Sequence, residues 1–266
     1  MKSQTKVVVL FSTITMCVEA QTEIHEQVVF GEHASSKHIK FISSRNYDIE
    51  SVVINDYLTP TKLDVIVPMC LGKTEIKLAP QAFSWMNVPN TEVALEFRGV
   101  GRKKGFESHT DFTKMFYNSS SLVSVDFAGF SHKPFIKNMT AMFKGCSKLK
   151  EIVWGELNTS NVTAMECMFS GCETVEEIDL INFDTSKVET MNHMFSSCHK
   201  LKSLDLSRFD TKNVTDVDGM LKNCYALESI NMCLFKPSLM HQIDQMSRDA
   251  RRQGLLRRLD HPDEVL

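Results

Sequence analysis

The stretch Met191–Thr211, MNHMFSSCHKLKSLDLSRFDT, decides the fold because its sequence pattern recurs in the chain. Upstream, Met165–Thr185 reads MECMFSGCETVEEIDLINFDT, with Met, Phe, Cys and the closing FDT at the same places. Met-Phe pairs, or Met-Leu in the last copy, begin at residues 115, 142, 168, 194 and 220, in steps of 27, 26, 26 and 26. A fixed period of this length is typical of proteins built from stacked repeats.

Five further columns keep the same period, and each holds one kind of side chain. A column shared by four or five copies indicates an interior slot that every repeat must fill. The columns are Ser119/Cys146/Cys172/Cys198/Cys224, Leu122/Leu149/Val175/Leu201/Leu227, Val125/Ile152/Ile178/Leu204/Ile230, Phe127/Trp154/Leu180/Leu206/Met232 and Phe130/Leu157/Phe183/Phe209/Phe235.

Each repeat has two halves with different periodicity. In SLDLS, Leu204 and Leu206 alternate with polar residues, which predicts a strand with one buried face. The apolar residues of the other half follow the stripe of an amphipathic helix, and the Asp-Thr-Ser before them can cap its first turn. These stripe residues are Val188, Met191, Met194, Phe195 and Cys198.

The pattern VxxMxxMFxxCxxLxxLDLS, as in Val188–Ser207, followed by FDT at Phe209–Thr211, resembles the BspA-like class of leucine-rich repeats. The likeness covers residues 111–236, with irregular first and last copies, as expected where a stack ends. The resemblance implies an α/β fold, a leucine-rich-repeat-like right-handed solenoid with a parallel β-sheet on one face and short helices on the other. It also implies adhesion or protein binding at a cell surface, and it carries over no catalytic residue.

Four regions are expected along the 266 residues. They are a signal peptide over 1–20, an N-terminal cap or degenerate repeats over 21–110, the repeats over 111–236, and a C-terminal capping helix and tail over 237–266. Thr91–Val100 imitates the strand of a repeat, so the sheet is expected to continue upstream. A separate small β-rich domain over 21–110 is the alternative.

The first twenty residues bear on localisation. Two lysines, a mainly apolar run of twelve residues and Ala20 before Gln21 match the three parts of a secretory signal peptide. The expected localisation is therefore secreted or cell surface. A buried β-strand is the alternative for the same run, because KVVVLF is rich in β-branched residues. In that case the protein would be cytoplasmic, as the scaffold subunit of a larger assembly.

The C-terminal region contains five arginines on a helical pattern with leucines beyond it. We expect it to cover the open end of the stack. Its basic character also allows contact with an anionic membrane or an acidic partner. No other contact with a membrane is expected.

The repeated cysteines suggest chemistry, but their positions argue against it. A structural zinc site needs four converging ligands, whereas Cys167 occurs in one copy only and His193 takes its place in the next. The column cysteines are expected to be small buried hydrophobes, with disulfides between adjacent copies as the alternative in a secreted chain. A cysteine nucleophile needs an oriented base and would not recur in four copies. We therefore expect no enzyme, no cofactor and no metal.

The remaining functional signal lies in the outward positions of the predicted strands. A net charge of −3 gives no reason to bind nucleic acid. The open sheet face is where stacked repeats bind extended partners, so a protein partner is expected there and the oligomeric state is left open. A calcium ion shared by two aspartates and a simply solvated face are the alternatives. The candidate partner-binding residues are Asp126, Glu151, Glu177, Asp179, Ser203, Asp205, Ser207 and Asn231.

Overall fold

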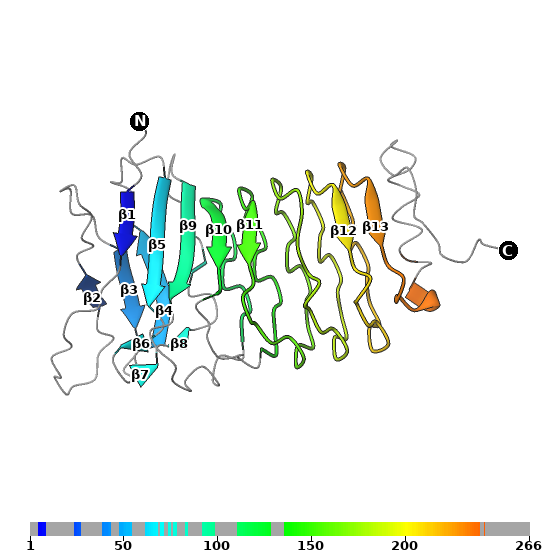
Figure 1. Ribbon diagram of the computed structural model, residues 1–266, viewed down its shortest axis with the longest axis horizontal. Coiled ribbons are helices and arrows are strands. Elements are labelled where there is room, and N and C mark those ends of the chain that lie inside the picture. Colours follow the sequence, from blue (N-terminus) through cyan, green and yellow to red (C-terminus); the bar gives the residue numbers. More distant parts are fainter. Residues whose placement is uncertain are drawn as a thin grey trace.

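A computed structural model describes residues 111–128, 136–239 and 242, together with Phe83, Ser84 and the upstream strands (Figure 1). The strands are β1 (Thr5–Val8), β2 (Ile24–Gln27), β3 (Ile39–Ser43), β4 (Asp48–Ile54), β5 (Lys62–Pro68), β6 (Cys70–Leu71), β7 (Thr74–Glu75), β8 (Lys77–Leu78), β9 (Glu92–Arg98), β10 (Leu122–Asp126), β11 (Glu151–Val153), β12 (Ser203–Asp205) and β13 (Ser229–Asn231).

Parallel strands follow one another along the long axis of the molecule, and each repeat except the third contributes one (Figure 1). One sheet has the order β1-β5-β9-β10-β11, and β12 and β13 form a second parallel pair. Ser124 lies opposite Glu151, and Ser203 lies opposite Ser229, so successive repeats are in the register that the columns predict. The parallel sheet of stacked repeats is therefore present.

The region before the repeats contains strands that continue the parallel sheet of the repeats and strands that form a separate sheet. β9 pairs in parallel with β10, and β5 pairs in parallel with β9, so the sheet of the repeats continues upstream. A separate sheet of order β2-β3-β4-β8 lies in the same region. β1 falls within the predicted signal peptide and pairs with β5. The division into domains and the cleavage after Ala20 remain predictions.

The predicted short helices are wrong. Between the sheet positions, alternate backbone N–H groups bond to the next repeat instead of to the carbonyl four residues back, as a helix requires. The intervening N–H groups bond three residues back, as in turns. In the fourth repeat, the donors to the next repeat are Met191, His193, Phe195 and Ser197, and their acceptors are the carbonyls of Asp216, Asp218, Met220 and Lys222, at 2.7–3.0 Å.

Left-handed residues explain why no helix forms. His193 has φ 52° and Ser197 has φ 61°, and a residue with positive φ ends an α-helix. The same two columns are left-handed in every repeat, at positions four residues apart. Their members are Lys114/Ala141/Cys167/His193/Gly219 and Asn118/Gly145/Gly171/Ser197/Asn223. Because the period of these turns resembles that of a helix, the apolar stripe still faces inward.

The core is a stack of like side chains. Phe116, Phe143, Phe169 and Phe195 are fully buried, and consecutive rings of this column lie 5.0–5.8 Å apart with planes within 10° of each other. Phe83 stacks on Phe116 at 5.6 Å, so the column begins upstream of the predicted repeats. Most of the predicted inward positions are buried, but Ile152, Trp154, Leu157 and Met232 are only partly buried.

The cysteine column has a hydrogen-bonding role in this stack. The Cys198 thiol donates to the carbonyl oxygen of Phe169 at 3.2 Å. The other three column thiols each donate to the carbonyl oxygen of the column phenylalanine in the preceding repeat. In the first repeat the Ser119 hydroxyl makes the equivalent bond to Phe83 at 2.7 Å. The column therefore selects a small side chain that can donate a hydrogen bond, and cysteine and serine both satisfy this need.

After the last repeat, residues 237–239 and 242 are helical, and Leu239 is buried. The side-chain oxygen of Gln242 accepts a hydrogen bond from the Val217 N–H at 3.3 Å. The predicted capping helix begins at the expected place, but most of residues 237–266 lies outside the described residues.

The phenylalanine column should dominate stability. Replacing Phe169 by Ala removes a fully buried ring that packs on Phe143 and Phe195, and we expect a loss of about 3–5 kcal/mol in the free energy of unfolding. Chemical denaturation followed by circular dichroism measures this loss. Leu234, which is 57% exposed, is the control, and its change to Ala should cost less than about 0.5 kcal/mol. Equal losses in the two variants would contradict the stacked core.

Candidate binding face

The predicted partner-binding residues lie on the outward face of the strands and in the turn that follows them. Glu151, Glu177, Asp179, Asp205 and Asn231 are exposed, and Asp126, Ser203 and Ser207 are half-buried. Strand pairing places Asp126 opposite Val153, and Asp205 opposite Asn231. The sequence therefore located an outward face correctly, whereas its role in binding is untested.

Each aspartate of this face caps the turn after its own strand position. One carboxylate oxygen of Asp126 accepts the N–H of Ala128 at 2.7 Å, Asp179 accepts that of Ile181 at 3.0 Å, and Asp205 accepts that of Ser207 at 2.9 Å. Hydrogen bonds from the Ser207 side chain first, and from its backbone N–H second, lower the pKa of Asp205. The caps fix the direction of the three carboxylates.

The charged residues of the two outward rows are all acidic. The rows run through positions 94/124/151/177/203/229 and 96/126/153/179/205/231, as set by the strand registers and the repeat period. They contain no lysine or arginine. Their carboxylates are Glu96, Asp126, Glu151, Glu177, Asp179 and Asp205.

Lysines next to these rows are paired with a different set of acids. Lys202 Nζ lies 2.5 Å from Glu176 Oε2, and this contact lowers the pKa of Glu176 and raises that of Lys202. Lys150 Nζ lies 3.4 Å from Glu92 Oε1. Because these pairs are exposed, they contribute little stability. Their effect is to hold the neighbouring cations against other acids, so the two rows keep their negative charge.

An interruption in the middle of the face was not predicted. Residues 177–179 belong to no strand, although their counterparts in the neighbouring repeats form β11 and β12. Val153 and Ile181 are each 39% exposed at this interruption. The alternating sequence of residues 176–180 matches that of its neighbours, so the sequence carried no signal for the break apart from Trp154, the only tryptophan of its column.

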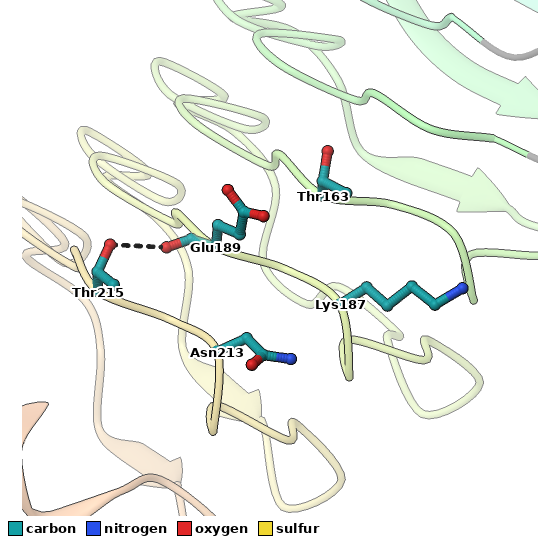
Figure 2. A pocket seen from close by; sticks show the side chains of 5 residues that line it. All are labelled: Thr163, Lys187, Glu189, Asn213 and Thr215. Carbon is teal, nitrogen blue, oxygen red and sulfur yellow. Dashed lines mark hydrogen bonds between the residues drawn. The ribbon is translucent and has the colours of Figure 1, made fainter.

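A polar groove lies on another side of the repeats (Figure 2). Its volume is about 450 Å³, and its lining residues come from three consecutive repeats: Thr163, Lys187, Glu189, Asn213 and Thr215. Several of these groups are already hydrogen-bonded, since Lys187 donates to Asn161 at 2.6 Å and Thr215 donates to the Glu189 carbonyl at 3.2 Å. None of these five residues was among the sequence candidates.

The column cysteines are not arranged for nucleophilic reactions or for metal binding. The column thiols are free and buried, and burial raises the pKa of Cys172 and Cys198, and that of Cys224 to about 12. The thiolate is the reactive form of cysteine and its metal ligand, so these side chains are inert at neutral pH. Within the described part of the chain, no group of three or more His, Cys, Asp or Glu side chains could hold a metal ion. Nor does that part contain a helix that is long and apolar enough to cross a membrane.

Comparisons with known proteins found one family and one solved structure that resemble parts of the chain. The family described as "Mycoplasma protein of unknown function, DUF285" matches residues 110–233, close to the predicted range of 111–236. No curated protein sequence matches the chain. The crystal structure of a leucine-rich repeat protein of T. pallidum is similar, with 19% sequence identity and a TM-score of 0.37 over 69% of this chain and 64% of that one. The chain thus spans less than two thirds of the length of that protein, and no residue role is carried over from it. The BspA-like assignment remains a prediction.

Thiol accessibility distinguishes the column from the exposed cysteine. In the folded protein we expect iodoacetamide at pH 8 to modify Cys233, which is exposed, and to leave Cys146, Cys172, Cys198 and Cys224 unmodified. Peptide mass spectrometry identifies each site, and the same reaction in guanidinium chloride, where all these thiols should react, is the control. Modification of any column cysteine at the rate of Cys233 would show that the column is not a closed interior slot.

Proposed function

We propose that the chain is a non-enzymatic protein-binding or adhesion module, secreted or exposed at a cell surface. Its BspA-like repeats would form a right-handed solenoid that presents the sheet face to a protein partner. The observation that carries the proposal is the pair of acidic outward rows, which contain six carboxylates and no basic residue from β9 to β13. A surface with one sign of charge attracts partners of the opposite sign and orients them.

Two properties of the face favour a protein partner over a small ligand. The rows extend across successive repeats, which neighbour one another at about 4.8 Å, so they offer a line of six carboxylates interspersed with small residues instead of a closed cavity. The aspartates on these rows are held by turn caps at 2.7–3.0 Å, so binding need not order them. A rigid surface loses less conformational entropy on association.

The proposal includes no catalytic role, cofactor or metal. The column cysteines are buried thiols with raised pKa, and they repeat in successive copies as packing residues. No nucleic-acid partner is proposed, because the net charge is −3 and the outward rows are acidic. Membrane contact is proposed only through the basic segment within residues 237–266.

Amide variants that keep the turn caps test the face. In Glu177→Gln, Asp179→Asn and Asp205→Asn combined, each Asn retains an oxygen that can accept the capping N–H, so charge is removed without removing the caps. We expect affinity capture by the intact protein to lose its specific partner, with a drop of at least about tenfold in recovery. Circular dichroism and the unfolding midpoint should stay unchanged.

A matched variant controls for net charge. Glu166→Gln, Glu173→Gln and Glu189→Gln combined remove the same three charges from positions off the two rows, and Glu189 lines the polar groove. This variant should capture the partner as the unchanged protein does. Equal capture by both triple variants would refute the sheet face as the binding surface, and loss in the control alone would move the site to the groove.

An intracellular scaffold subunit is the second candidate, and one observation favours it. β1 lies within the predicted signal peptide and pairs with β5 in register, Thr5 opposite Leu63 and Val8 opposite Ile66. A retained N-terminus would make this strand part of the sheet. The scaffold would then dock through its repeats and its basic C-terminal region.

The mature N-terminus separates the two candidates. For a secreted module we expect the protein purified from its native source to begin at Gln21, because cleavage follows Ala20. Intact-mass measurement and N-terminal sequencing give the answer. A protein that begins at Met1 and is recovered from the cytoplasm would refute secretion and support the scaffold.

A further inference from the structure

The acidic face is interrupted at its centre, between β11 and β12. Residues Glu177–Asp179 occupy the place of a strand but pair with neither neighbour, so the parallel ladder stops at β11 and resumes at β12. The gap can be followed in Figure 1 as plain loops between the β11 and β12 arrows. The gap coincides with two of the candidate binding residues, Glu177 and Asp179.

The side chain of Trp154 takes part in the gap on its β11 side. In the first repeat the Phe127 N–H donates to the Val153 carbonyl at 2.7 Å, and in the fourth the Leu206 N–H donates to the Asn231 carbonyl at 2.8 Å. In the second repeat the equivalent carbonyl, that of Asp179, instead accepts the indole N–H of Trp154 at 2.6 Å. The indole thus takes the acceptor that the backbone uses elsewhere, and the two repeats do not form ladder bonds here.

Apolar surface is exposed as a result. Ile152, Trp154 and Leu157 are only partly buried, whereas the corresponding Leu204, Leu206 and Phe209 are buried. Val153, on the same strand, is 39% exposed in the row of aspartates, between Asp126 and Asp179, and Ile181 is 39% exposed two residues beyond Asp179. Val153 and Ile181 are therefore exposed apolar side chains within a face whose charged residues are acidic, and we call the two the Trp154 spot. The ring of Trp154 itself packs inward beside them, against Phe127 and Phe143.

We infer that this face binds an extended basic segment of a partner protein, with one apolar side chain on the Trp154 spot and lysine or arginine side chains on the carboxylates around it. The inference rests on the proposed function and names the partner's chemistry. An apolar centre surrounded by charged groups is the arrangement in which interfaces concentrate their binding energy. Charge complementarity selects a basic partner because all the charged residues of the rows are acids.

The spacing defines the partner segment more closely. Asp126 and Asp179 are two repeats apart in one row, with Val153 between them. Two rungs correspond to about 10 Å, and residues i, i+2 and i+4 of an extended chain share one face and span about 13 Å, which long basic side chains can adjust to both carboxylates. The matching segment therefore has two basic residues four positions apart, with a large apolar residue midway between them.

Short synthetic peptides test this segment directly. Fluorescein-labelled peptides that contain Lys-Gly-Leu-Gly-Lys, Lys-Gly-Gly-Gly-Lys or Glu-Gly-Leu-Gly-Glu, in which alternate residues share one face, are titrated with the full chain at low ionic strength, and anisotropy reports binding. We expect the first peptide to bind about tenfold more tightly than the second. The acidic peptide should not bind, and added salt should weaken the binding of both lysine peptides.

Variants of the protein separate the contribution of the apolar side chains from that of the carboxylates. Val153→Ser with Ile181→Ser should abolish the preference for leucine and leave the weaker binding of Lys-Gly-Gly-Gly-Lys intact. Asp179→Asn with Asp205→Asn should weaken both lysine peptides. Leu234→Ser, at an exposed leucine away from the face, is the matched control and should change neither affinity.

The outcomes separate this inference from the proposed function. Equal binding of the first two peptides, or a leucine preference that survives Val153→Ser with Ile181→Ser, would overturn the apolar anchor while the acidic binding face stands. Absence of binding by both lysine peptides would overturn the basic segment, and the capture experiment would still decide the face. Calcium binding that is lost in Asp179→Asn with Asp205→Asn, or concentration-dependent self-association lost in the same variant, would instead assign the face to a cation or to a second copy.

Discussion

The structure depends on the backbone hydrogen bonds that join each repeat to the next between the strands. Four N–H groups of a repeat donate to the following one, as Phe195 does to Met220 at 3.0 Å. Because the donors recur at the same places, every side chain lies directly over its counterpart in the neighbouring repeat. The phenylalanine rings then stack at 5.0–5.8 Å, and each column thiol reaches the carbonyl of the phenylalanine one repeat back. Methionine, phenylalanine and cysteine recur because this stacking leaves one shape of slot at each position.

The same stacking explains which features of the fold could be predicted from the sequence. The period, the parallel strands and the buried columns follow from matching letters, since identical slots demand similar side chains. The helix was predicted wrongly because these turns place apolar residues inward at nearly helical intervals. A signal against it was available: the column of Ser197 holds Gly145, Gly171 and Asn223, which are residue types that favour positive φ. His193, with φ 52°, gives no such signal by itself.

The candidate binding face shows which features the repeated pattern does not determine. The stack does not constrain which residues occupy the outward positions. Aspartate nevertheless recurs there, as Asp126, Asp179 and Asp205, so the sequence alone could indicate an acidic outward face. The gap at residues 177–179 could not be predicted, because it depends on contacts between repeats, such as that of the Trp154 indole with the Asp179 carbonyl at 2.6 Å. On the β11 side, this large side chain occupies the acceptor that backbone pairing uses in the first and fourth repeats.

The central claim is that backbone bonds between repeats, and not helical bonds within them, hold the turns in place. The most direct measurement is the scalar coupling across hydrogen bonds by NMR in the deuterated protein. We predict a coupling from the amide nitrogen of Phe195 to the carbonyl carbon of Met220, and an equivalent one from Phe169 to Met194. A coupling from Phe195 to the carbonyl carbon of Met191, four residues back, would instead show a helix and contradict this account.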